Sequence, residues 1–384
     1  MQFSGYRRKD GKVGIRNHVI IVPGVICASV AARKIADASG AVFVANPNGC
    51  GQSPEDTVTT LRIVTGLIAN PNVFGALIVG LGCETLQEER YRSALAKLTD
   101  KPVEYIMIQD QGLGAAVEKG TDIAARLLEK ASEIKREPCE VSELILGLEC
   151  GGSDPTSGLC SNVVLGKVTD RLIDLGGSAA LTETPEAIGA EHILKRRGAT
   201  PEVGQKIYDS IKAFEQIFLD RGMNVREGNP SPGNIASGIT TLEEKSLGCI
   251  HKAGTRPFSA FYSYGEQITE KGLCFIDTTA FDVASVTAKA AAGSQITVFT
   301  TGRGNPVGNP VSPVIKMTAN KDTAERLADI IDFDTSAAIS GEVTQDQLAD
   351  ELFAYIIRVC EGELTKAEIN GSGEILINQQ MSYC

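Results

Sequence analysis

Histidine is scarce in this sequence, with three among 384 residues, and no two cysteines are separated by two residues. Three histidines are too few for a histidine-rich metal site, and a chain without a Cys-x-x-Cys pair does not form a zinc ribbon. No apolar run approaches the roughly 18 residues that a membrane-spanning helix requires. The sequence therefore predicts neither a zinc ribbon nor a transmembrane segment, although any one histidine could act as a base.

Positive charge is also in deficit. The chain has 37 Lys and Arg against 48 Asp and Glu, so its formal net charge is −11 and its pI is about 5.0. This balance argues against a nucleic-acid partner and against attraction to an anionic membrane surface, but a locally basic site could still bind an anionic small molecule. The first residues are basic and polar, without the apolar core of a signal peptide. We expect a cytoplasmic protein whose ten cysteines are free, metal-binding or catalytic.

Short apolar runs alternate with helical stretches along the chain, which is the pattern of parallel βα units. The predicted strands are 19–22, 41–45, 76–79, 103–108, 144–148, 178–181, 273–276 and 296–300. The stretch 228–234 is so rich in Gly, Pro and Asn that we expect a loop. The sequence predicts an α/β fold with two doubly wound, mainly parallel, Rossmann-like sheets that share a cleft. We expect a first domain over 1–137 and a second over 138–384.

The stretch from Leu144 to Pro155 is central to this prediction. An apolar run ends in Cys150-Gly151-Gly152-Ser153-Asp154, a tight turn that carries a thiol, a hydroxyl and a carboxylate. Ligands of open α/β sheets bind beyond the carboxyl ends of the strands, so this turn is well placed for chemistry. A plain glycine-rich connection between strand and helix is the alternative.

Four cysteines each follow a predicted strand: Cys27, Cys50, Cys83 and Cys150. A single buried cysteine usually packs as a small apolar residue. Cys50, Cys83 and Cys150 differ because each lies in a turn close to glycine, where a thiol is presented rather than packed. Three such thiolates suit an iron–sulfur cluster with one open iron, or a soft divalent metal. The role of Cys160 is left open, and the cysteines expected to be structural or incidental are Cys139, Cys274, Cys360 and Cys384.

Oxygen and nitrogen groups are expected at the same edge. Arg303 lies between two glycines and could bind a carboxylate, and Lys252 in the polar segment 251–255 could be a base or an anion contact. Each of the accompanying residues could instead be a helix cap or a turn residue. They are Ser153, Asp154, Glu183, Glu186, Asp277, Thr278 and Thr301.

Several motifs, in order along the chain, are similar to those of the altronate/galactarate dehydratase family. They are Gly5-Tyr6-Arg7-Arg8, Gly14-Ile15-Arg16-Asn17, Gly80-Leu81-Gly82-Cys83-Glu84, Cys150-Gly151-Gly152-Ser153-Asp154, Glu183-Thr184-Pro185-Glu186, Gly228-Asn229-Pro230-Ser231-Pro232-Gly233-Asn234, Glu244-Lys245-Ser246-Leu247-Gly248 and Phe299-Thr300-Thr301-Gly302-Arg303-Gly304. The resemblance implies loss of water from an aldonate such as altronate, giving a 2-keto-3-deoxy acid. It also implies a divalent metal, usually iron. We expect Fe²⁺, and the alternatives are Mn²⁺ or, on the grounds of the cysteines themselves, a [4Fe-4S] cluster on three cysteines.

On this resemblance we assign roles to the candidate residues. The expected metal ligands are Cys50, Cys83 and Cys150. The expected catalytic residues are Glu183, Lys252 and Asp154, and those expected to bind substrate are Ser153, Thr301 and Arg303. The identity of the base stays open between Glu183, Lys252 and a histidine of another chain. Alternative functions are galactarate dehydratase, the large subunit of a sulfolactate sulfo-lyase, and a non-catalytic iron–sulfur protein.

Members of this family often carry a small domain before the Gly-Tyr-Arg-Arg motif, which here begins at Gly5. The chain therefore resembles the large subunit of a two-subunit dehydratase. We expect a separate small subunit that supplies the other domain, and we expect the chain to form a homo-oligomer.

Overall fold

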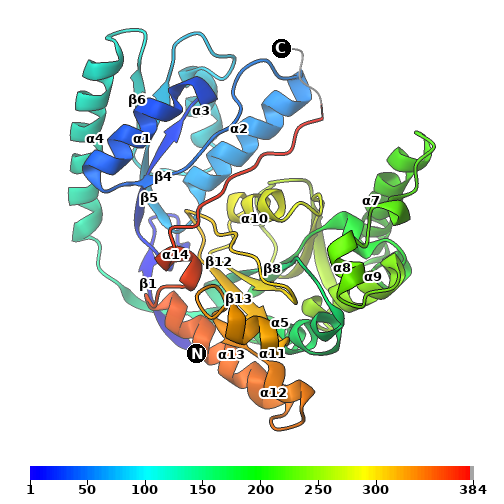
Figure 1. Ribbon diagram of the computed structural model, residues 1–384. Helices are drawn as coiled ribbons and strands as arrows, with labels where there is room; N and C mark the ends of the chain where they lie inside the picture. Colours follow the sequence, from blue (N-terminus) through cyan, green and yellow to red (C-terminus); the bar gives the residue numbers. More distant parts are fainter. Residues whose placement is uncertain (381–384) are drawn as a thin grey trace.

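The computed structural model describes residues 1–380 (Figure 1). Its first parallel sheet has the strand order β4-β3-β5-β6. These strands are β4 (Val42–Phe43), β3 (His18–Pro23), β5 (Val73–Gly80) and β6 (Val103–Met107). Helices pack on both faces: α1 (Ser29–Ser39) with α4 (Leu113–Glu133), and α2 (Pro54–Ala69) with α3 (Glu88–Leu95).

The second parallel sheet has seven strands in the order β10-β11-β9-β8-β12-β13-β14, with β8 at its centre. The strands are β10 (Phe258–Tyr262), β11 (Gly272–Ile276), β9 (Ser178–Leu181), β8 (Ile145–Cys150), β12 (Ile296–Thr300), β13 (Val314–Thr318) and β14 (Phe333–Asp334). Helices α5 (Asn162–Asp174) and α13 (Gln345–Cys360) pack together, and α10 (Asp282–Ala291) contacts β8 and β12. The predicted fold class, α/β with two doubly wound parallel sheets, is confirmed.

A small antiparallel sheet joins the two parts of the chain. Its order is β2-β1-β7, formed by β2 (Val13–Gly14), β1 (Gln2–Arg7) and β7 (Glu137–Glu140). The predicted boundary between 137 and 138 falls inside β7, which pairs with the very start of the chain. The division into domains 1–137 and 138–384 stays a prediction.

Alternation along β8 decides which side chains reach which layer. Leu146 and Leu148 are buried in a core that includes Val164 of α5 and Leu352 of α13. Gly147 and Glu149 face the other way, because successive side chains of a strand alternate between the two faces, and a Cβ at Gly147 would meet the side chain of Lys289 in α10. The strand therefore delivers Glu149 to one face and Cys150 to the other.

A group of helices follows β9 and lies beyond the carboxyl edge of the seven-stranded sheet, drawn in green in Figure 1. Its members are η4 (Thr184–Ala187), α6 (Glu191–Arg196), α7 (Pro201–Leu219), η5 (Val225–Glu227), α8 (Pro232–Ala236), α9 (Leu242–Ile250) and η6 (His251–Ala253). The predicted loop 228–234 is wrong in its last part, because Ser231 caps α8 and Pro232 occupies the first helical turn.

The remaining elements are short. They are η1 (Ile26–Ala28), η2 (Val141–Glu143), η3 (Ser157–Ser161), α11 (Lys321–Arg326), α12 (Ser336–Ile339) and α14 (Lys366–Ile369). Within residues 1–380, none of the helices combines the length and the apolarity that crossing a membrane requires.

Candidate active site

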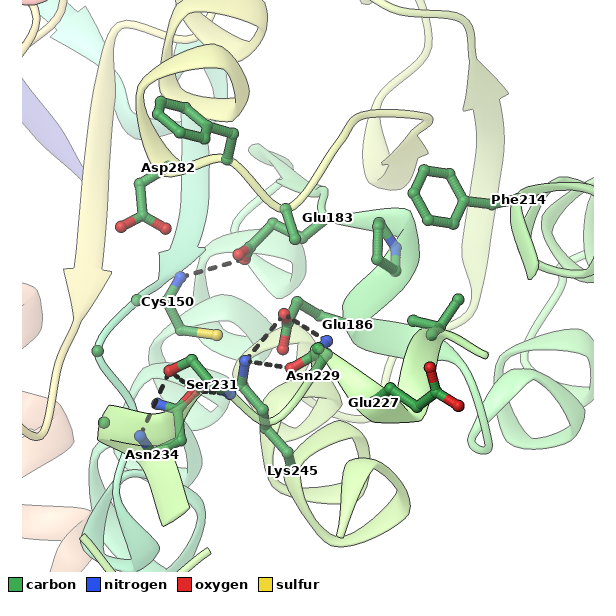
Figure 2. Close-up of a pocket in the computed structure, with 18 of the residues that line it drawn as sticks. Cys150, Glu183, Glu186, Phe214, Glu227, Asn229, Ser231, Asn234, Lys245 and Asp282 are labelled. Carbon is green, nitrogen blue, oxygen red and sulfur yellow. Dashed lines mark hydrogen bonds and ion pairs between the residues drawn. The ribbon is translucent and has the colours of Figure 1, made fainter. Parts of the chain in front are cut away.

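A cavity of about 860 Å³ lies between the carboxyl edge of the seven-stranded sheet and helices α7 to α9. All of its lining comes from residues 150–304, so it is not shared with the four-stranded sheet. Figure 2 shows the polar side chains that face it: Cys150, Glu183, Glu186, Asn229, Lys245 and Asp282. Cavities at the carboxyl ends of parallel strands are the usual ligand sites of open α/β sheets.

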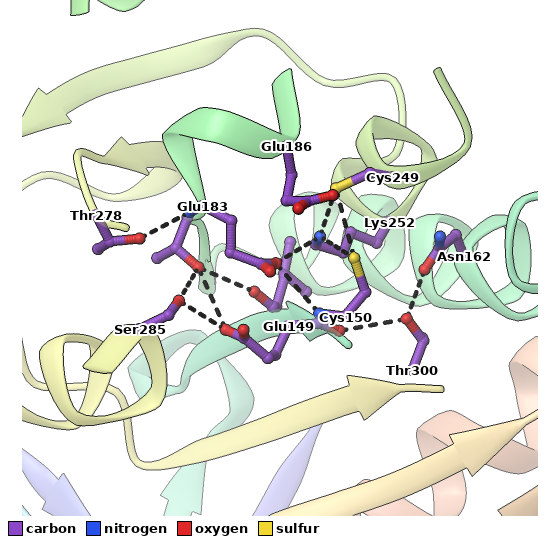
Figure 3. A network of polar contacts seen from close by, with 12 residues as sticks. Glu149, Cys150, Asn162, Glu183, Glu186, Cys249, Lys252, Thr278, Ser285 and Thr300 are labelled. Carbon is purple, nitrogen blue, oxygen red and sulfur yellow. Dashed lines mark hydrogen bonds and ion pairs between the residues drawn. The ribbon is translucent and has the colours of Figure 1, made fainter. Parts of the chain in front are cut away.

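Lys252 forms a buried cluster next to this cavity. Its Nζ lies 3.0 Å from Cys150 Sγ, 2.9 Å from Cys249 Sγ and 2.9 Å from Glu183 Oε2. The two sulfurs are 3.5 Å apart. The Lys252 side chain is 0% exposed and that of Glu183 is 1% exposed. The three N–H bonds of the ammonium thus meet three acceptors, as Figure 3 shows.

These contacts determine which groups of the cluster are ionised. Burial alone lowers the pKa of Lys252, but Cys150, Cys249 and Glu183 raise that pKa well above its usual value. The hydrogen bond between the two thiols raises the pKa of Cys150 and lowers that of Cys249. Lys252 is therefore a cation, Cys150 keeps its proton, and Cys249 is the sulfur that more readily loses its proton.

A second buried group shares Glu183 with the first. The carboxylates of Glu149, Glu183 and Asp282 have oxygens within 4.8 Å of one another. Glu149 Oε2 accepts hydrogen bonds from Ser285 Oγ (2.7 Å) and from Lys289, whereas Glu149 Oε1 is buried without a hydrogen-bond partner among the described residues. Burial raises the pKa of Asp282 to about 7, and the charges of Glu183 and Glu186 contribute to this. Lys289 faces Glu149 and Lys252 faces Glu183, but Asp282 forms no ion pair within residues 1–380 and one Glu149 oxygen stays unpaired.

The backbone of Glu183 is strained. Its φ of 70° lies in the left-handed region, and among residues 1–380 no other non-glycine residue has a positive φ. The conformation is held by the Thr278 hydroxyl, which lies 2.8 Å from Glu183 N, and by the Cys150 N–H, which donates to Glu183 Oε2 at 3.2 Å. Such strain costs about 1–3 kcal/mol and clusters at functional sites. This backbone conformation directs the Glu183 carboxylate both toward Lys252 and toward the other two carboxylates, Glu149 and Asp282.

The opposite wall of the cavity carries positive charge. Lys245 Nζ lies 3.0 Å from Glu186 Oε1 and 2.8 Å from Asn229 Oδ1, while Glu186 Oε2 is buried and has no partner within residues 1–380. Arg303 donates to Gly233 O at 3.0 Å and to the Ser237 hydroxyl at 2.7 Å. A free carboxylate oxygen thus lies in the same cavity as two cations.

The predicted catalytic and substrate-binding residues lie in three places. Glu183 and Arg303 line the cavity, and Lys252 lies directly behind Glu183. Asp154 accepts hydrogen bonds from Thr156, Ser157 and Asn320, which fix the turn after β8. Ser153 accepts from Asn234 through its carbonyl oxygen, and the Thr301 hydroxyl accepts from the Gly304 N–H. Ser153, Asp154 and Thr301 do not line this cavity.

The predicted metal ligands are not brought together around one ion. Cys150 ends β8, whereas Cys50 and Cys83 are exposed in loops of the four-stranded sheet. Within residues 1–380, neither group of potential ligand atoms lying within 4.8 Å of one another includes Cys50 or Cys83. The physical reason is that the strands before these cysteines belong to two different sheets.

The two groups that do exist differ in how well they fit a metal ion. Cys150, Cys249 and Glu183 offer suitable donors, but the Lys252 ammonium already lies between them and fills the place of a cation. In the carboxylate trio, Glu149 faces Lys289 and Glu183 faces Lys252, but Asp282 forms no ion pair within residues 1–380 and Glu149 Oε1 is unpaired, so negative charge remains in excess. The trio therefore fits a divalent ion that accepts oxygen ligands.

Sequence reasoning assigned no role to four residues of the site: Glu149, Asp282, Cys249 and Lys245. Glu149 is a charged residue at the end of an otherwise apolar strand, and that contrast was a usable signal. Asp282 opens α10 and resembles an ordinary acidic residue of a first helical turn. Cys249 lies in α9, three residues before Lys252, and only this spacing, which places both on one side of a helical turn, pointed to it.

Comparisons with known proteins agree with the family that the sequence motifs resemble. Residues 5–132 match the family profile described as D-galactarate dehydratase/altronate hydrolase, second domain, and residues 141–383 match D-galactarate/altronate dehydratase, C-terminal. The chain is 39% identical to altronate dehydratase of Bacillus subtilis, over 98% of this chain and 77% of that protein. It is 36% identical to altronate dehydratase of Escherichia coli, over 97% and 76%. It is 34% identical to (2R)-sulfolactate sulfo-lyase subunit beta of Chromohalobacter salexigens, over 98% and 97%. The chain belongs to the galactarate/altronate dehydratase family of lyases.

Proposed function

We propose that this protein is a sugar-acid dehydratase that removes water from an aldonate such as altronate and gives a 2-keto-3-deoxy acid. The two altronate dehydratases among its relatives support this substrate class. The observation that carries the proposal is the arrangement of the cavity, where Glu186, with one unpaired oxygen, and two cations share one space with Glu183 and Asp282 of the carboxylate trio.

Lys245 and Arg303 bind the carboxylate of the substrate. Both side chains line the cavity, and Lys245 is held in place by Glu186 and Asn229. Arginine suits this role because its guanidinium matches a carboxylate with two parallel hydrogen bonds. An anionic substrate is thereby attracted into a chain whose net charge is −11.

Glu186 is the base that takes the proton from the α-carbon. Its Oε1 is occupied by Lys245 and Asn229, and its Oε2 is free to accept a proton. Cys150 keeps its thiol proton and lines the same cavity, so it can protonate the departing β-hydroxyl. Lys252, with its Nζ 3.0 Å from that sulfur, stabilises the thiolate that remains.

Glu149, Glu183 and Asp282 would hold the Fe²⁺ or Mn²⁺ that the family implies. When bound there, a divalent ion supplies positive charge that stabilises the enediolate formed from the substrate. The Cys150 and Cys249 sulfurs are not assigned to this ion, because Lys252 lies between them.

The test compares Glu186→Gln with Glu202→Gln, which changes an exposed carboxylate in the first turn of α7. Anaerobic protein is assayed with Fe²⁺ or Mn²⁺ on a panel of aldonates and aldarates, with and without a candidate small subunit. Loss of a general base lowers kcat by about 10²–10⁴, so Glu186→Gln should lose this factor and Glu202→Gln should not. Equal activity of Glu186→Gln and the parent chain would overturn the role of Glu186. No turnover of any sugar acid under these conditions would overturn the function.

A second candidate is cleavage of a carbon–sulfur bond in a sulfonated hydroxy acid. The observation that favours it is the match to the sulfo-lyase subunit, which extends over 97% of that protein. The same base and cations would serve this reaction. Release of sulfite from sulfolactate, without formation of keto-deoxy acid from altronate or galactarate, would select it.

The relative named as a beta subunit also supports a two-subunit enzyme, in which a separate small subunit completes this chain. We retain a homo-oligomer of such pairs as part of the proposal. The described cysteines are all free thiols, which supports work in the reducing cytoplasm.

A further inference from the structure

Three cysteines of the four-stranded sheet are exposed, and the other six described cysteines of the chain are buried. Cys27 follows β3, Cys50 follows β4 and Cys83 follows β5. These three strands are neighbours in the order β4-β3-β5-β6. The chain leaves β3 for β4 on one side and later adds β5 on the other, so the cysteines surround the point where a doubly wound sheet binds its ligands.

The three cysteine-bearing loops touch one another. Ile26 N donates to Asn48 O at 2.9 Å, which joins the Cys27 segment to the Cys50 loop. Leu86 N donates to Gly49 O at 3.2 Å, which joins the Cys50 loop to the Cys83 loop. Main-chain hydrogen bonds therefore connect the segments that carry the three cysteines, next to Cys27 and Cys50 and three residues after Cys83.

Glycines make this close approach possible. Gly49 has a φ of 106° and Gly82 a φ of 129°, conformations that other residues rarely adopt. A Cβ at Gly49 would lie 2.5 Å from Gly24 O, and a Cβ at Gly82 would lie 2.5 Å from Gln109 Oε1. A larger residue at Gly49 would push its loop away from the segment that leads to Cys27, and one at Gly82 would displace the Gln109 side chain.

Polar groups hold the loops and face two of the sulfurs. The buried Glu84 carboxylate accepts the Leu81 N–H at 3.0 Å and the Gly82 N–H at 2.5 Å, which pins the turn that carries Cys83. Gln109 Nε2 lies 3.5 Å from Cys83 Sγ, and Thr85 Oγ1 lies 3.8 Å from Cys50 Sγ. Donors directed at cysteine sulfur stabilise thiolates and tune the iron–sulfur clusters that they bind.

We propose that Cys27, Cys50 and Cys83 bind a [4Fe-4S] cluster at the carboxyl edge of the four-stranded sheet. A single metal ion requires close ligand atoms because its bonds to sulfur are about 2.3 Å long. Within residues 1–380, the groups of ligand atoms with that spacing do not include these cysteines. A cluster bonds each cysteine to a different iron and so spans a wider triangle of sulfurs. Three cysteines leave one iron open to an oxygen ligand.

This site is separate from the cavity in residues 150–304, and it does not rest on the proposed dehydratase activity. The ligand set expected from sequence contained Cys150, and in the proposed site Cys27 takes its place. Cys150 is buried against Lys252 beside the other sheet, and therefore provides an internal contrast.

The test is spectroscopic and needs no substrate. The full chain is purified anaerobically, reconstituted with iron and sulfide, and compared with Cys27→Ser, Cys50→Ser, Cys83→Ser and Cys150→Ser. We expect about four irons and four acid-labile sulfides per chain, with the broad visible absorption of a cluster, in the parent and in Cys150→Ser. Each of the other three variants should lose most of this signal while its circular dichroism is unchanged, because the substituted side chains are exposed.

Three results would overturn the proposal. One is a parent chain without cluster absorption after reconstitution. Another is an unchanged cluster in Cys27→Ser, which would exclude Cys27 as a ligand. The third is loss of the cluster in Cys150→Ser, which would restore Cys150 to the ligand set. Because the readout is iron, sulfide and absorption, a failed activity assay leaves this result intact and points to the proposed function instead.

Discussion

Lys252→Met removes the ammonium from the centre of the buried cluster. In the parent protein the Lys252 Nζ has three contacts of 2.9–3.0 Å, to Cys150, Cys249 and Glu183. Removing one partner of a buried ion pair costs about 3–5 kcal/mol, because the remaining charge stays buried without compensation. Without Lys252 the pKa of Cys249 rises and the neutral thiol is favoured, which limits the loss. We therefore expect a decrease of about 3 kcal/mol in the free energy of unfolding at pH 7.

The measurement is urea denaturation followed by circular dichroism. Lys212→Met is a matched control, because Lys212 also contacts two carboxylates, Glu191 and Glu215, but its side chain is 42% exposed. An exposed pair contributes about 0–1 kcal/mol, so the control should change little. Adding Glu183→Gln to Lys252→Met removes the uncompensated carboxylate and should restore about 1–2 kcal/mol.

A second readout follows the charge directly. The hydrogen bond from Cys150 and the charge of Lys252 both lower the pKa of Cys249. Lys252→Met should therefore move the rise of thiolate ultraviolet absorbance to higher pH in a pH titration. The reasoning fails if Lys252→Met lowers the unfolding free energy by less than about 1 kcal/mol and leaves the thiolate signal unchanged, since the cluster would then not depend on its cation.

Three further predictions concern other parts of the chain. Asp282→Asn should weaken Mn²⁺ binding, measured by paramagnetic resonance titration, by about tenfold or more, while Cys150→Ser should not; equal affinities would exclude the carboxylate trio. Burial, with Arg16 nearby, lowers the pKa of His18 to about 4, so the unfolded chain binds more protons than the native one and stability should fall by about 1–3 kcal/mol between pH 6.5 and pH 4. His18→Asn should flatten this fall in pH-dependent denaturation, and the exposed His192→Asn should not. Thr344→Ala should cost about 1 kcal/mol in thermal unfolding because it removes the N-terminal cap of α13; an unchanged melting temperature would contradict this.

The part of the site that sequence could predict follows strand ends. Cys150 ends β8, Glu183 comes two residues after β9, and Arg303 comes three residues after β12. In a parallel sheet all strands end at one edge, so short apolar runs are enough to predict that these side chains gather. The same rule applies to Cys27, Cys50 and Cys83 in the four-stranded sheet.

The remainder depended on packing that the chain does not encode locally. Nothing in the apolar runs indicates which strands share a sheet, and for that reason the ligand set expected from sequence combines Cys50 and Cys83 with Cys150, which follows a strand of the other sheet. Lys245 and Cys249 reach the site from α9, a helix that folds back over the sheet edge. The angle of such a helix is set by contacts with residues distant in the sequence rather than by its own amphipathic pattern.

Glu183 couples the two polar groups of the cavity. Its single carboxylate contacts Lys252 and also belongs to the trio with Glu149 and Asp282. A cation bound by the trio would draw on the charge of Glu183 and weaken its attraction to Lys252. The ammonium would then depend more on Cys249, which would favour the thiolate form of that sulfur. In this scheme the strained backbone of Glu183, with φ of 70°, holds one carboxylate between the Lys252 ammonium and the cation proposed for the trio.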